Sequence, residues 1–177
     1  MGLFEAEPDT YLPRNEGGLI AIDYVHAKIH QGLHFTATTY HSDATATNII
    51  VTAPATGVYH FVAEVVTSGP AAVYWSRTPD IDATGATVIT AYNNDEASEN
   101  TSTLTHKLGG VYASSGTLLN RWLIGSATGN PGQPVNLGGG ASHEHEWELL
   151  ASSTHLLRVV KGASCETVIR MTYYREE

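Results

Sequence analysis

The chain has 177 residues, with 9 Lys and Arg against 18 Asp and Glu, which gives a formal net charge of -9. This charge makes the protein a poor ligand for phosphate backbones and anionic lipids, so we expect neither nucleic-acid nor membrane binding. Charged residues make up only 15% of the chain, whereas roughly 25% is usual. The length fits one domain, and the composition favours a β-rich domain that buries part of its surface against neighbours.

The first 18 residues differ from the rest of the chain. They contain Pro8, Pro13, Gly17 and Gly18 and show no apolar period, a pattern typical of an extended arm. They also lack a basic segment followed by an apolar run, so we predict no secretory signal. The interpretation is an extended N-terminal arm over 1–18 and a single folded domain over 19–177.

From Leu19 onward the pattern is that of β-structure. Runs rich in Val, Ile, Thr and Tyr are interrupted every ten or so residues by Gly, Pro, Asn or Asp, as in antiparallel sheets. No apolar stretch approaches the roughly 20 residues that span a bilayer. Eleven short strands without a long helix predict an all-β, antiparallel β-sandwich that resembles a jelly roll. The predicted strands are 19–25, 33–40, 46–53, 57–67, 71–76, 86–92, 101–107, 117–124, 143–150, 154–161 and 165–175.

Two predicted strands carry clear alternation. In 165–175, Cys165, Ile169, Met171 and Tyr173 share one face, which we expect to lie in the core. In 143–150, three glutamates share the face opposite the histidines, Trp147 and Leu149, and aligned carboxylates need water or a basic partner. Between 125 and 142, prolines and glycines predict a long loop.

Histidine spacing invites a test for metal ligands. His26, His30 and His34 recur every four residues, which on a helix would align three imidazoles for zinc. Gly32 follows too soon for a secure helix, and in an extended chain successive members lie roughly 13 Å apart, at about 3.3 Å per residue. We therefore favour hydrogen-bonding or subunit-contact histidines over a metal site.

Other motifs match known sites only in part. His143, His145 and Glu148 imitate a cupin metal motif, but a second motif with its further histidine is not found. A segment starting at Asp80 opens like a calcium loop, yet its twelfth position is Ala91 instead of a glutamate. We predict no metal and no cofactor.

Catalytic signatures are similarly weak. The serine pairs lack the Gly-x-Ser-x-Gly context of a nucleophile. Cys165 falls on a predicted core face, where a thiol is normally inert. We predict no catalytic residue and a protein that is not an enzyme.

Three segments together resemble a known family. They are 22–30 (IDYVHAKIH), 92–103 (YNNDEASENTST), and the pair 144–150 (EHEWELL) and 155–158 (HLLR). Their order is similar to that of small virion structural proteins encoded by tailed bacteriophages, of the head decoration or capsid cement type. The resemblance covers about 150 residues from Leu19.

The resemblance implies a function without chemistry. It implies a homotrimeric β-sandwich, made in the host cytoplasm, that binds the major capsid protein on the outer surface of the head. The arm is then expected to contact the shell, with Phe4, Tyr11 and Leu12 as candidate contacts. His26, His30 and Trp147 are candidates for contacts between subunits.

Two alternatives remain open at this stage. The same sandwich suits a carbohydrate- or receptor-binding module of a virion, with Tyr74, Trp75 and Trp122 as a sugar platform. A cupin-type enzyme using His143 is the other. Bound glycan would support the first and bound metal the second.

Overall fold

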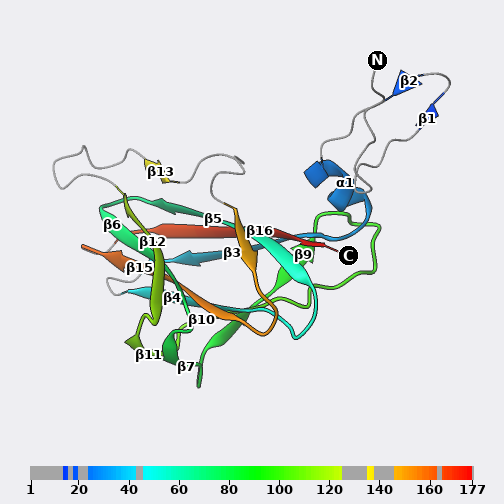
Figure 1. Ribbon diagram of the computed structural model, residues 1–177. Coiled ribbons are helices and arrows are strands. Elements are labelled where there is room, and N and C mark those ends of the chain that lie inside the picture. The colour runs from blue at the N-terminus through cyan, green and yellow to red at the C-terminus, as the bar shows by residue number, and fades with distance from the viewer. Residues whose placement is uncertain are drawn as a thin grey trace, which may run out of the picture.

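The chain folds into two antiparallel β-sheets packed face to face (Figure 1). The computed structural model describes residues 14–15, 18–19, 24–42, 46–124, 135–137, 146–162 and 165–176, with backbone alone at 14–15, 18–19, 24 and 135–137. Sheet I contains β13 (Val135–Leu137) and β14 (Trp147–Leu149), both on β5 (Val58–Thr67), followed by β16 (Thr167–Glu176), β3 (His34–His41) and β9 (Ala91–Asn93). Sheet II runs β12 (Thr117–Ile124), β6 (Ala71–Arg77), β15 (Thr154–Lys161), β4 (Thr47–Thr52), β10 (Thr105–Leu108) and β8 (Thr87–Ile89).

The pairing of the strands is that of a jelly roll. Four antiparallel pairs are nested in chain order: β3 with β16, β4 with β15, β5 with β14, and β6 with β12. The outermost pair joins the first and last strands of the sandwich, β3 and β16, and each further pair lies inside the previous one along the chain. This nesting is the jelly-roll arrangement. The prediction of an all-β, jelly-roll-like sandwich is confirmed.

An insertion between β6 and β12 adds to both sheets. Its strands β8 and β10 extend sheet II, and β9 extends sheet I beside β3. Its other two strands, β7 (Asp80–Asp82) and β11 (Val111–Ser114), pair in a small sheet of their own, which lies on the outer side of sheet II (Figure 1). The sequence prediction missed β7 and β11, and it treated 86–92 as one strand where β8 and β9 belong to different sheets.

The core lies between the sheets and follows the alternation of the strands. On β16, Ile169, Met171 and Tyr173 are almost completely buried, as predicted. Cys165 is only partly buried and precedes the strand, so its placement in the core was wrong. The aromatic centre of the core is Trp75 of β6, stacked on Phe61 of β5.

A helix, α1, precedes the sandwich and spans Tyr24–His30. The sequence pattern predicts a strand over 19–25 and no regular element between it and the strand at 33–40. It ends in a Schellman motif, in which the N–H of Gly32 donates to Ile29 O and that of Leu33 to Lys28 O. Gly32 has a φ of 65°, the left-handed conformation that this cap requires. Gly32, which in the sequence argues against a helix, is thus the residue that caps it. The helix is short, and burial of Ala27 against the sandwich helps to stabilise it.

The N-terminal arm is described only in part. Arg14–Asn15 (β1) and Gly18–Leu19 (β2) pair as a short hairpin, set apart from both sheets beyond α1 (Figure 1). The candidate capsid contacts Phe4, Tyr11 and Leu12 lie outside the described residues. No helix in the described part of the chain is long and apolar enough to cross a membrane.

Candidate functional site

The outer surface of sheet I forms a broad exposed face, here called the open face. Three cross-strand rows compose it, because residues in register on β3, β16 and β5 point to the same side. The rows are Tyr40, Val168 and Val66; Thr38, Arg170 and Glu64; and Thr36, Thr172 and Val62, with Tyr92 beside Thr36. Apart from Arg170 and Glu64, which are in register with each other, all of these side chains are uncharged.

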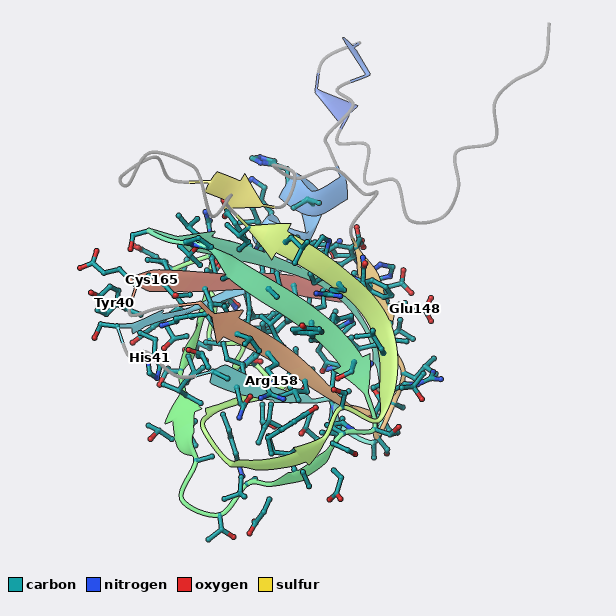
Figure 2. All side chains as sticks on the ribbon, turned by 90° about the vertical axis from the view of Figure 1, so that its left-hand side faces the viewer. Tyr40, His41, Glu148, Arg158 and Cys165 are labelled. Atoms are coloured by element: carbon teal, nitrogen blue, oxygen red, sulfur yellow. The ribbon has the colours of Figure 1, made fainter. Side chains whose placement is uncertain are left out.

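The open face carries three large exposed side chains. Tyr40 is 56% exposed and Val168 beside it is 38% exposed, and Tyr92, two rows away beside Thr36, is 70% exposed. Figure 2 shows Tyr40 at the end of the sheet near Cys165, on the side opposite Glu148. A hydrogen bond with the Glu166 carboxylate raises the pKa of the Tyr40 phenol. Large exposed apolar side chains grouped on one sheet face are typical of protein interfaces.

The centre of the outer face of sheet II is, by contrast, covered by the chain itself. Ile50 and Leu156 point outward from β4 and β15, yet they are 4% and 0% exposed. The paired strands β7 and β11 lie over this part of the sheet: the guanidinium of Arg158 sits 3.6 Å from the ring centroid of Tyr112 on β11, and Figure 2 shows Arg158 on this face. The insertion thus covers the middle of sheet II, while at its edges Leu118, Leu123 and Val88 stay 51%, 66% and 67% exposed.

A cluster of titratable groups lies at the other end of sheet I. Nε2 of His60 on β5 lies 2.9 Å from Oε1 of Glu176 on β16, and Nδ1 of the same ring contacts Oε1 of Glu146 just before β14. The Tyr174 hydroxyl donates to Glu146 Oε1 over 2.5 Å, and the His60 and Tyr174 rings stack at 4.6 Å. The cluster joins three strands, and Glu146 has the basic partner that the sequence pattern called for.

The three histidines at intervals of four separate into a pair and a single residue. His26 and His30 are exposed neighbours on α1, with their Nε2 atoms 3.0 Å apart. His34 begins β3, where it is buried and its Nδ1 lies 2.7 Å from Nδ2 of Asn94. Burial, and then the charge of Arg170, lower the pKa of His34. The helix that aligns two of these residues ends before the third.

Two further histidines belong to the core. His106 and His155 are 2% and 3% exposed, and the ring of His155 stacks on Trp75 with centroids 5.0 Å apart. Burial lowers the pKa of His106 to about 4, and burial together with the charge of Arg77 lowers that of His155 to about 4. Both rings are therefore neutral at pH 7 and act as packed aromatic groups.

The aromatic candidates occupy different environments. Trp147 is partly buried and packs against Trp75, with ring centroids 6.5 Å apart. Trp75 is 1% exposed, so it cannot form part of a sugar platform. Trp122 is partly buried against the core. Where side chains are described, the exposed aromatic residues are instead Tyr40 and Tyr92. Strand alternation in 33–40 and 86–92 is the sequence signal that could have pointed to them.

A small pocket lies between β5 and the loop before β10. It measures about 70 Å³ and is lined by Leu33, Phe35, Tyr59, Asn100, Thr101, Thr103 and Arg175. Pockets that hold metabolite-sized ligands are several times larger, about 300 to 1,000 Å³. Within the described ranges, no group of three or more His, Cys, Asp or Glu side chains is placed so that it could hold a metal ion. His143 and His145 lie outside those ranges.

Comparison with known proteins leaves the geometry as the main guide to function. No protein-family model, curated protein or solved structure matches this chain.

Proposed function

We propose that this protein is a non-enzymatic decoration protein of a tailed-bacteriophage head, which binds the major capsid protein on the outer surface of the assembled shell and stabilises it. The open face of sheet I is the observation that carries the proposal. An exposed face of valine, threonine and tyrosine is suited to contact with another protein, because it buries apolar area without desolvating many charges.

The two-sided build of the sandwich supports this role. The paired strands β7 and β11 cover the centre of sheet II, whereas Tyr40 and Tyr92 on the outer side of sheet I stay 56% and 70% exposed, and we assign the partner to that side. We infer the major capsid protein as the partner from the resemblance of three sequence segments to phage decoration proteins. A repeating shell offers many copies of one site, and a trimeric decoration protein gains affinity there by multivalency.

The test uses two matched substitutions in the full chain. Val168→Lys places a charge on the open face, and Val111→Lys places the same charge on the exposed side of β11, where Val111 is 68% exposed. Each variant is mixed with phage heads that lack the decoration protein, and bound copies are counted after sedimentation. Light scattering of the free variants reports their oligomeric state.

We expect wild type and Val111→Lys to fill the heads equally and Val168→Lys to bind at least about tenfold more weakly, since a buried unpaired charge costs well over 1.4 kcal/mol. Equal binding by both variants would exclude the open face as the capsid surface. Failure of the wild type to bind any head, together with binding to glycans that Tyr40→Ala abolishes, would replace the proposal with the carbohydrate-binding alternative.

A further inference from the structure

The pair of histidines on α1 forms an arrangement that the proposed function does not use. His26 and His30 stand one helical turn apart, both exposed, with Nε2 atoms 3.0 Å from each other and ring planes 76° apart. In the absence of a metal, one ring donates its Nε2 proton to the other. The same two nitrogens are the atoms through which imidazoles most often bind metal ions.

The distance between the nitrogens indicates the kind of ion. With metal–nitrogen bonds of about 2.05 Å, two nitrogens 3.0 Å apart subtend an angle of about 94° at the metal. Adjacent positions of a square-planar or octahedral ion require about 90°, whereas a tetrahedral ion such as Zn²⁺ requires about 109°. The observed spacing therefore suits Cu²⁺ or Ni²⁺ better than Zn²⁺.

The helix fixes the backbone on which the two histidines stand one turn apart. Its C-terminus is capped by the Schellman hydrogen bonds of Gly32 and Leu33. Ala27 and Lys28, which lie between the two histidines in the sequence, are buried. The face that carries His26 and His30 therefore stays turned to solvent. Because the two imidazoles already lie close together on an ordered helix, metal binding does not have to offset the entropy cost of ordering the backbone.

We propose that His26 and His30 form a two-ligand surface site for a divalent transition-metal ion of the Cu²⁺ or Ni²⁺ type, with water in its remaining coordination positions. Binding replaces the proton shared between the two Nε2 atoms, which moves to an Nδ1 atom or to solvent. Because imidazole must be neutral to bind a metal, affinity falls in acid. The site is independent of the open face and of capsid binding.

The decisive experiment is isothermal titration calorimetry, in which Ni²⁺ is added to the full chain at pH 7.5. The variants are His26→Ala, His30→Ala and a spacing control, His26→Ala combined with Gln31→His. This control keeps two histidines in or directly after the helix, but they are now the adjacent residues 30 and 31. Adjacent side chains point in different directions and cannot bind the same ion. His143→Ala with His145→Ala tests the other close pair in the sequence.

We expect wild type and the 143/145 variant to bind one Ni²⁺ per chain through this site, and each single variant and the spacing control to bind at least about tenfold more weakly, because the second imidazole adds its bond intramolecularly. Circular dichroism verifies that each variant is folded. Affinity in the spacing control equal to that of wild type would overturn the proposal. Loss of binding in the 143/145 variant alone would also overturn it, by placing the ion elsewhere.

Discussion

Phe61 and Trp75 stack across the centre of the sandwich, with ring centroids 5.2 Å apart and an angle of 8° between the rings. Phe61 belongs to sheet I and Trp75 to sheet II, so this contact joins the two layers. On its other side, the indole of Trp75 stacks on His155. The two sheets thus share one aromatic column, and the tryptophan is its middle member.

Replacing Trp75 by alanine should remove that column. We expect Trp75→Ala to lower the free energy of unfolding by about 3 to 5 kcal/mol, the usual cost of truncating a buried aromatic residue. Urea denaturation followed by far-UV circular dichroism measures the loss. Trp122→Ala serves as the control and should cost clearly less, because Trp122 is only partly buried; equal losses would contradict the central role of Trp75.

Acid should destabilise the fold through its core histidines. Burial lowers the pKa of His106 to about 4. Below pH 6.5, therefore, the imidazole of His106 is protonated in the unfolded chain but stays neutral in the folded chain. The stabilisation is complete above pH 6.5 and is lost as the pH falls toward 4. For His106 alone, the free energy of unfolding should drop by about 2 kcal/mol between pH 6.5 and 5.

Urea denaturation at a series of pH values tests this dependence. The variant His106→Gln should show a shallower pH slope over the same range, because it lacks the titrating ring. An identical slope in the variant and the wild type would show that other groups cause the acid sensitivity.

The contact between His60 and Glu176 should show measurable coupling. A double-mutant cycle with His60→Ala and Glu176→Ala should give an interaction energy of up to about 1 kcal/mol, the range for partly exposed pairs. The control cycle uses Glu64→Ala in place of Glu176→Ala, because Glu64 lies four residues along β5 from His60, roughly 13 Å away at about 3.3 Å per residue. We expect coupling near zero there, and equal coupling in both cycles would remove the special status of the 2.9 Å contact.

Two glycines offer a test of backbone strain at turns. Gly116 and Gly85 both have positive φ, at 65° and 76°. A Cβ at Gly116 would collide with the carbonyl oxygen of Thr78, whereas one at Gly85 meets nothing within 4 Å. Gly116→Ala should therefore lower the melting temperature clearly more than Gly85→Ala, as measured by thermal denaturation; the reverse order would contradict the turn geometry.

Deletion of residues 1–18 tests the arm separately from the sandwich. The body of the jelly roll begins at β3, so the truncated protein should remain folded and keep its oligomeric state. Under the proposed function it should no longer bind phage heads in sedimentation assays. Undiminished binding would assign capsid contact to the sandwich alone.

The sequence predicts the sandwich well because its main strands are apolar runs bounded by turn residues. Strands 117–124 and 154–161 match β12 and β15 to the residue, since glycine follows each of them and glycine or serine precedes it. β7 and β11 were missed because three- and four-residue strands among glycines carry too little pattern. The helix was missed because Gly32 was weighed as a breaker, when its position fits a cap.

The site was less predictable, because it depends on register. His60, Glu146 and Glu176 are far apart in the chain, and only the pairing of β5 with β14 and β16 brings them together. The period of each strand could place Tyr40 on an outer face, but only the fold shows that Tyr40 stays 56% exposed there while Ile50 on the outer side of sheet II is 4% exposed. Pairing between distant strands leaves no local pattern in one sequence.

The paired strands β7 and β11 have one more consequence. They lie on the side of the sandwich away from sheet I (Figure 1), and the turn at Gly85 that follows β7 has open space beside its Cα. Foreign peptides inserted at that turn would then be presented outward on every attached copy, which makes the turn a natural point for display on a particle.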